Sequence, residues 1–125
     1  LGLLFDTLQK HYSIEAGAEI TLECNPDDLN PQTLKMLQDL GVNRLSIGLQ
    51  SFDEAELRWM NRAHTAAESE ASVKRAQDKG FDNITIDLIY GSKFQTLKSW
   101  KQTLQKAIDL DVKHISAYNL TIESK

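Results

Sequence analysis

The sequence predicts an α/β fold in which short parallel strands alternate with helices, and three observations lead to this expectation. Four short segments share one pattern: an apolar residue, a hydroxyl residue, a second apolar residue and a variable residue. Stretches with the helical spacing of apolar residues separate these segments. The length of 125 residues, with 41% hydrophobic and 26% charged residues, suits one compact domain.

The four patterned segments are the expected strands. Alternation of apolar and polar residues has the two-residue period of a β-strand. Gly41 and Gly80 precede the second and third segments, at positions where a glycine can end a helix in a left-handed conformation. The predicted strands cover residues 20–23, 45–48, 84–87 and 115–118.

Capping residues and apolar spacing predict helices before the first strand and between all strands. Asn30, which is followed by proline, can begin a helix, and Thr96 can begin the last one. Ser51 and Thr65 each precede a glutamate by three positions, which matches the capping box. The side chains expected to face the core are Leu34, Leu37, Leu40, Ala71, Val73, Ala76, Leu97, Trp100, Leu104, Ala107 and Ile108.

The architecture follows from the order of elements and from a polar strand face. Strands alternating with helices form right-handed βαβ units and a parallel sheet, either an open doubly wound sheet or an arc of a barrel. Thr21, Ser46, Thr85 and Ser116 place hydroxyl groups on one face, whereas a doubly wound sheet buries both faces under helices. Four strands cannot close a barrel. We therefore expect residues 1–125 to be one piece of a partial parallel (β/α) barrel that continues elsewhere in a parent protein.

Composition argues against several classes of function. The net charge of -4 and a pI near 5.3 disfavour general binding to nucleic acid or anionic membranes. No apolar run reaches the roughly 20 residues of a membrane span. Cys24 is the only cysteine, so neither an internal disulfide nor a cysteine-only metal cage can form. The three histidines are well separated and do not suggest a zinc site. A reducing, cytoplasmic setting is expected.

Polar residues at the predicted strand ends mark the candidate site. Functional groups of parallel barrels gather at the carboxyl ends of the strands, where Glu23, Gln50 and Asp87 lie. Arg62 follows one helix later and can hold a ligand carboxylate, and Tyr118 lies on the last strand. The two acids can perform acid/base chemistry, bind a divalent metal, accept hydrogen bonds from ribose hydroxyls, or cap local backbone groups.

Several motifs occur in a fixed order along the chain. They are residues 19–26 (EITLECNP), 44–52 (RLSIGLQSF), 61–65 (NRAHT) and 83–91 (NITIDLIYG). In sequence and spacing they closely resemble the oxygen-independent coproporphyrinogen III oxidase family, which is of the radical S-adenosylmethionine (SAM) type. The resemblance covers nearly the whole chain from about residue 19 and implies a radical SAM barrel.

The resemblance also implies a cofactor set. The family uses a [4Fe-4S] cluster to cleave SAM reductively, which gives a 5'-deoxyadenosyl radical. The implied SAM contacts are Glu23, Gln50, Arg62 and Asp87, with Arg62 pairing with the methionyl carboxylate and the others holding the ribose or amino group. Thr121 matches a position whose backbone approaches SAM in the oxidase branch, which is a weaker implication. The family's three cluster cysteines and its C-terminal domain have no counterpart in this chain, so we expect it to hold no cluster, no other metal and no catalytic residue.

Two branches of the family compete as the parent of this chain. The oxidases decarboxylate two propionates of coproporphyrinogen III, whereas the chaperone-like branch binds heme and SAM. Residues 50–53 and 62–65 resemble the chaperone branch more closely. The implied function is the SAM-binding wall of a protein of heme metabolism, with heme or coproporphyrinogen III and an electron donor as partners, and inactive in isolation. A true oxidase is the alternative, and a metal-dependent barrel hydrolase using Glu23 and Asp87 is a remote one.

One loop departs from the family pattern. After Tyr90 and Gly91 the family normally has Leu-Pro-Gly, but this chain has Ser92, Lys93 and Phe94. Loss of the proline frees the backbone of the loop, so contacts of this loop cannot be transferred from relatives.

Overall fold

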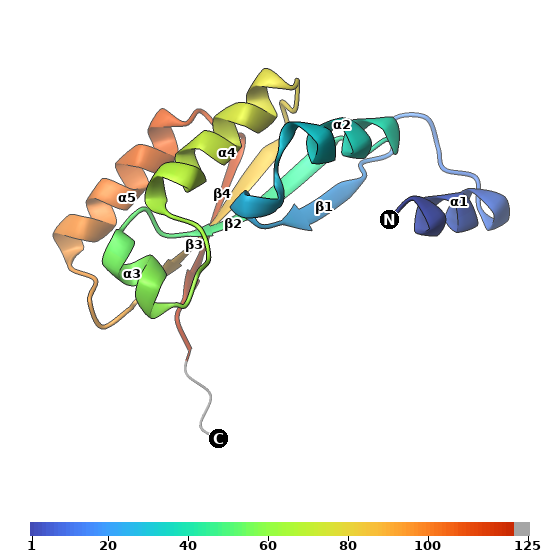
Figure 1. The fold of residues 1–125 in the computed structure, drawn as a ribbon. Helices are drawn as coiled ribbons and strands as arrows, with labels where there is room; N and C mark the ends of the chain where they lie inside the picture. The colour runs from blue at the N-terminus through green and yellow to red at the C-terminus, as the bar shows by residue number, and fades with distance from the viewer. Residues whose placement is uncertain (122–125) are drawn as a thin grey trace.

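Four parallel strands form one sheet in the computed structural model, which describes residues 1–121. The strands lie side by side in chain order: β1 (Thr21–Cys24), β2 (Arg44–Gln50), β3 (Ile84–Tyr90) and β4 (His114–Asn119). Figure 1 shows this sheet beneath a layer of helices. The predicted α/β fold with four parallel strands is confirmed.

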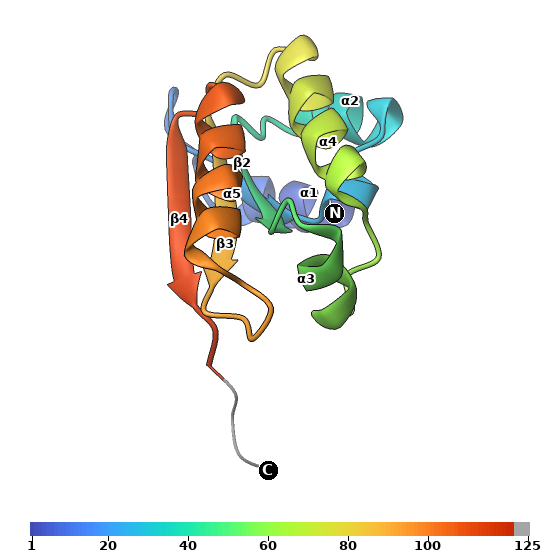
Figure 2. The ribbon, with the colours of Figure 1, turned by 90° about the vertical axis from the view of Figure 1, so that its left-hand side faces the viewer.

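The helices of the described residues are α1 (Gly2–His11), the short 3-10 helix η1 (Pro26–Asp28), α2 (Pro31–Asp39), α3 (Glu54–Trp59), α4 (Ala66–Asp78) and α5 (Leu97–Asp109). In Figure 1, α1 lies apart from the others beyond β1, and the layer that covers the sheet consists of the later helices. The sheet is seen nearly edge-on in Figure 2, with α2, α4 and α5 along one face and α3 near the carboxyl ends of β2 and β3. This one-sided layer suits the wall of a barrel and not a doubly wound sheet. Within residues 1–121, no helix has both the length and the apolar character required to cross a membrane.

The core lies between the sheet and this helix layer. Leu45, Ile47, Ile86 and Leu88 are completely buried, and they pack with residues from the helices. Burying one such side chain contributes about 1.5–3 kcal/mol. The apolar face of the sheet is therefore the main source of stability. The helix residues of this core include Leu34, Leu37, Val73, Ala76 and Ala107.

Three of the predicted helix starts are confirmed and one is wrong. Asn30, Thr65 and Thr96 each accept a hydrogen bond from a backbone amide in the first turn of α2, α4 and α5. At α3, however, Asp53 is the capping residue, and Ser51 lies buried before the helix. The Asp53 carboxylate accepts from two amides of the first turn, so it satisfies two donors where a hydroxyl satisfies one.

The predicted core-facing sides of α4 and α5 are partly wrong. Ala71 is exposed, because α4 turns Ser69, Ser72, Val73 and Ala76 toward the sheet. In α5, the buried residues are Thr103 and Ala107, while Leu97 and Ile108 are 72% and 62% exposed. Leu97 and Ile108 lie about 80° and about 100° around the helix from Ala107, on opposite sides of it. Which flank of a helix is covered depends on its tertiary neighbours, which the local pattern does not contain.

The opposite face of the sheet is polar, and its residues are staggered. Glu23 lies opposite Ser46, which in turn lies opposite Thr85, and Asp87 lies opposite Ser116. The hydroxyl residues Ser46 and Thr85 are therefore level with each other, whereas Ser46 is displaced by two residues from Thr21 of β1, and Ser116 by two residues from Thr85. A stagger between neighbouring strands is what closure of a barrel requires. It also places each acid beside a hydroxyl of the next strand.

Candidate functional site

A polar recess of about 280 Å³ lies at the carboxyl ends of β1, β2 and β3. All four residues predicted as cofactor contacts line it: Glu23, Gln50, Arg62 and Asp87. They come from four different parts of the chain and meet only because parallel strands end at the same edge of the sheet. The other lining residues are Cys24, Asn25, Ser46 and Gly48.

Arg62 enters the polar recess from the turn after α3. Asn61 adopts a left-handed φ of 53°, a conformation that asparagine tolerates better than most residues, and the chain reverses there. The Arg62 Nη2 group donates to Asn25 Oδ1 at 2.7 Å and to the Gly48 carbonyl at 3.4 Å. Arg62 Nε is buried and has no partner among the described residues. A buried, unpaired donor on a cation is a good fit to an anionic ligand group.

Gln50 and Gly48 depend on each other at the end of β2. Gln50 has a φ of 68°, and the register between β2 and β3 shifts between Ile47 and Gln50. This bulge returns the Gln50 side chain over Gly48, where an added Cβ would lie 2.9 Å from Gln50 Nε2. Gly48 is therefore required for the close approach of the Gln50 side chain.

The two acids differ in their surroundings. Asp87 is half-buried, and one of its oxygens accepts a hydrogen bond from Ser46 Oγ at 3.0 Å. Glu23 is exposed at the end of β1. Asp87 is therefore the more firmly oriented acceptor, and Glu23 the more adaptable one. A pair of acceptors beside a guanidinium suits a ligand with hydroxyl or ammonium groups at one end and a carboxylate at the other.

Cys24 lines the polar recess but does not suit metal binding. Burial, together with the charges of Asp28 and Asp87, raises the pKa of the Cys24 thiol to about 12. The thiol donates to the Ser46 carbonyl at 3.6 Å, so it remains protonated at neutral pH. Among residues 1–121, no group of three His, Cys, Asp or Glu side chains could hold a metal ion. The geometry therefore gives no support to the metal-dependent hydrolase.

Two residues of β4 and its extension lie outside the polar recess. Tyr118 pairs with Ile89, which lies two residues beyond Asp87 along β3, and it is 58% exposed. Thr121 is exposed just after the strand and does not line the polar recess. The weaker implication that Thr121 approaches a cofactor stays a prediction.

A second recess of about 390 Å³ adjoins the polar one. Gln50 and Arg62 line both, so their side chains form the wall between the two. The rest of its lining is largely apolar and consists of Trp59, Met60, Asn61, Ile89 and Leu120. Trp59 is half-buried and lines this space.

Buried polar contacts behind the two recesses were not predicted from the sequence. The Glu56 carboxylate accepts from Ser51 Oγ at 2.6 Å and from Gln95 Nε2 at 3.3 Å, which joins three separate segments. His64 is buried, and its Nε2 donates to the Leu49 carbonyl at 3.1 Å. The contacts of Glu56 with Gln95 and of His64 with Leu49 connect residues 39 and 15 positions apart in the sequence. Only the family motifs, which include Ser51 and His64, hint at them.

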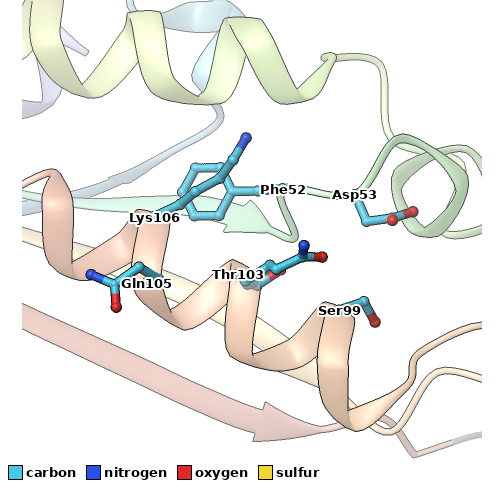
Figure 3. Close-up of a pocket in the computed structure, with 7 residues that line it drawn as sticks. Phe52, Asp53, Ser99, Thr103, Gln105 and Lys106 are labelled. Carbon is cyan, nitrogen blue, oxygen red and sulfur yellow. The ribbon is translucent and has the colours of Figure 1, made fainter.

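The chain also has a pocket of about 420 Å³ on the helix side, between α5 and the loop after β2 (Figure 3). Phe52 and Asp53 lie on one side of it, and Ser99, Thr103 and Lys106 on the other. The Lys106 ammonium is held by Glu70 at 2.8 Å. This pocket is larger than the polar recess, but it lies on the helix side of the sheet and contains none of the residues predicted as cofactor contacts.

A parallel sheet with helices on one side and a polar recess at its strand ends is the arrangement of one wall of a β/α barrel. Residues 1–107 match the Radical SAM superfamily, and the chain belongs to this superfamily. Proteins of this superfamily use SAM and a [4Fe-4S] cluster, as the resemblance implied.

Individual relatives agree with this assignment. The chain is 38% identical over 123 residues to the heme chaperone HemW of Lactococcus lactis subsp. lactis (strain IL1403), covering 98% of this chain and 32% of that protein. It is 42% identical over 108 residues to HemW of Bacillus subtilis (strain 168), covering 86% and 28%. The solved structure of coproporphyrinogen III oxidase (HemN) from Escherichia coli superimposes with a TM-score of 0.88 at 32% identity, covering 96% and 28%. The chain thus spans about a third of the length of its relatives.

Proposed function

We propose that this chain forms the SAM-binding wall of a radical SAM protein that handles heme and acts in the cytoplasm. The observation that carries the proposal is the meeting of Glu23, Gln50, Arg62 and Asp87 in one polar recess. The free, buried Nε of Arg62 supports an anionic ligand group at this place. The proposed parent resembles the heme chaperones, and a true coproporphyrinogen III oxidase is the alternative.

The residues of the polar recess fit SAM by their chemistry. Arg62 would bind the methionyl carboxylate, because a guanidinium donates strong, charge-assisted hydrogen bonds to carboxylates. Asp87 and Glu23 would accept from ribose hydroxyls or from the amino group, and Gln50 can serve as donor and acceptor. When bound and reduced, SAM supplies radical chemistry. The chain's own contribution is to hold and orient it.

A [4Fe-4S] cluster does not fit the residues of this chain. Cluster irons are held by cysteine thiolates, and the one cysteine is Cys24, whose raised pKa keeps it protonated. We therefore assign the cluster to the rest of the parent protein and no step to this chain's thiol.

The test of SAM binding uses the full-length protein, reconstituted with iron and sulfide, and isothermal titration with SAM. Arg62→Ala is expected to weaken binding by about tenfold to a hundredfold, because hydrogen bonds to a charged group contribute about 1.5–3 kcal/mol. Arg58→Ala is the matched control, since Arg58 lies exposed on α3 and outside both recesses. Equal affinities of the wild type and Arg62→Ala would overturn the proposed site.

Heme binding and oxidase activity can be distinguished with one preparation of the protein. The full-length, cluster-reconstituted protein is titrated with hemin and is then assayed for decarboxylation of coproporphyrinogen III with SAM and a reductant under anaerobic conditions. The proposal expects heme binding without turnover. Its motivation is the similarity of the chain to HemW proteins at 38% and 42% identity. Turnover of coproporphyrinogen III would establish the alternative.

A further inference from the structure

The loop between β3 and α5 has fixed ends and an exposed tip. At its start, the Gly91 amide donates to Gln95 Oε1 at 2.9 Å, and Ser92 is buried. At its end, Gln95 donates to the buried Glu56 carboxylate. Lys93 and Phe94, between these anchors, are exposed, with Phe94 at 50%. The loop therefore presents a cation and an aromatic ring to solvent, while hydrogen bonds of the Gln95 side chain hold its two ends.

Trp59, Lys93 and Phe94 form a cluster, here named the Lys93 platform. The Trp59 and Phe94 rings meet edge to face with centroids 6.0 Å apart. The Lys93 ammonium lies 4.9 Å from the centroid of Phe94 and 5.7 Å from that of Trp59. Figure 2 shows why they meet: α3, which carries Trp59, and the loop after β3 both lie at the carboxyl end of the sheet. Among residues 1–121, Lys93 forms no ion pair or hydrogen bond, so its charge is available to a ligand.

The Lys93 platform borders the second recess, because Trp59 belongs to both. A molecule in this recess would lie against Trp59, Ile89 and Leu120 and would be separated from the polar recess only by Gln50 and Arg62. Apolar walls bind an aromatic body, and exposed aromatic rings stack on one another. The free ammonium at the rim suits a carboxylate.

We infer that the second recess and the Lys93 platform bind the edge of a planar tetrapyrrole, with one of its carboxylates on Lys93 and a ring against Phe94 and Trp59. This inference rests on the proposed function and adds to it a place for the tetrapyrrole, next to the SAM recess. The volume of about 390 Å³ accommodates part of such a ring system. The rest extends over the exposed platform.

A purely structural role of Lys93 predicts different behaviour. Its cation–π contacts could serve only to order the loop, and exposed contacts of this kind contribute about 0.5–1 kcal/mol. In that case, loss of Lys93 would affect all ligands of the second recess alike. Binding of a carboxylate by Lys93 instead makes the effect depend on whether the carboxylates of the ligand are free.

The experiment uses the full-length protein and titration by absorbance with hemin, coproporphyrin III and mesoporphyrin dimethyl ester. For hemin and coproporphyrin III, Lys93→Ala is expected to weaken binding by about threefold to tenfold, and Lys93→Arg to restore most of it. Phe94→Ala is expected to weaken all three ligands by about twofold to tenfold. Lys98→Ala serves as the control, because Lys98 is an exposed lysine in the first turn of α5. SAM affinity is measured for every variant and is expected to stay unchanged.

The outcomes separate this inference from the proposed function. If the wild type binds SAM and a tetrapyrrole but Lys93→Ala and Phe94→Ala bind as tightly, only the Lys93 platform is overturned. If Lys93→Ala weakens the dimethyl ester as much as the free acids, the lysine does not bind a carboxylate and the inference also fails. If the wild type binds no tetrapyrrole at all, the heme part of the proposed function fails first.

Discussion

The two faces of the same sheet perform different tasks. On the helix side, Ile47 and Ile86 are completely buried and pack in a continuous apolar core. On the other side, one residue along each strand, Ser46 and Asp87 hydrogen-bond to each other at the edge of an open recess. Since successive residues of a strand point to opposite faces, stability and ligand binding are separated by a single step in the sequence. Substitutions on the helix side should therefore lower the free energy of unfolding, and substitutions on the polar side should weaken ligand binding.

The largest effect is expected from the apolar face. Ile86→Ala in the full-length protein should lower the free energy of unfolding by about 2–5 kcal/mol, because it leaves a cavity at a fully buried position. Leu97→Ala is the control: Leu97 is 72% exposed, and we expect a change within about 0.5 kcal/mol. Urea denaturation measures both. A loss of SAM affinity by folded Ile86→Ala protein comparable to that of Arg62→Ala would contradict the separation of the faces.

A smaller effect, on binding only, is expected at Gly48. A methyl group there would lie 2.9 Å from Gln50 Nε2, so Gly48→Ala should displace the Gln50 side chain and weaken SAM binding by about threefold to tenfold. Gly2→Ala is a matched control, since nothing lies within 4 Å of the added carbon. Isothermal titration gives the affinities and thermal unfolding gives the stabilities. Unchanged SAM affinity in Gly48→Ala would show that the position of Gln50 is unimportant.

The next prediction concerns Thr65, the capping residue of α4, which lies on neither face of the sheet. Thr65→Ala should lower the free energy of unfolding by about 1 kcal/mol, because the Glu68 amide loses its acceptor. Thr7→Ala, at an exposed position inside α1, is the control. SAM affinity should not change in either variant.

The same cap predicts a pH dependence. Hydrogen bonds from the Thr65 amide, and then from its hydroxyl, hold the pKa of Glu68 below its ordinary value of 4.5. The contribution of ionised Glu68 is thus present above pH 4.5 and is lost as the pH falls through the lowered pKa. The difference in stability between the wild type and Glu68→Gln should therefore shrink on acidification. A constant difference between pH 7 and pH 3 would contradict the assignment.

The last prediction concerns the rate at which the Cys24 thiol reacts, and it involves no change in the stability of the fold. Because its pKa is raised to about 12, Cys24 should react with iodoacetamide at pH 8 at least about tenfold more slowly than an unhindered thiol. Mass spectrometry follows the alkylation, with glutathione as the reference thiol. Fast alkylation of the folded protein would show that the thiol is ionised and would reopen the question of metal binding.

Local patterns predicted the strands and most helix starts because these depend on neighbours in sequence. The alternation around Thr85 and the cap at Thr65 are examples. Strand position and parity predicted Glu23, Gln50 and Asp87 as candidate residues of the polar recess. Arg62 was a candidate because it follows one helix later, and the motif resemblance strengthened it. The left-handed turn at Gln50 and the hydrogen bond from Arg62 to Asn25 could not be predicted, because each depends on how distant segments meet. Exposure of Leu97 was missed for the same reason.

The anchored loop between β3 and α5 has a consequence for divergence among relatives. Its two ends are held by contacts of Gly91 and Gln95 that do not involve the side chains at its tip. Residues 93 and 94 can therefore be exchanged without moving β3 or disturbing Asp87, which lies on the same strand. A protein with this arrangement can change the ligand that binds beside the loop through a few substitutions, while the residues of the polar recess keep their positions.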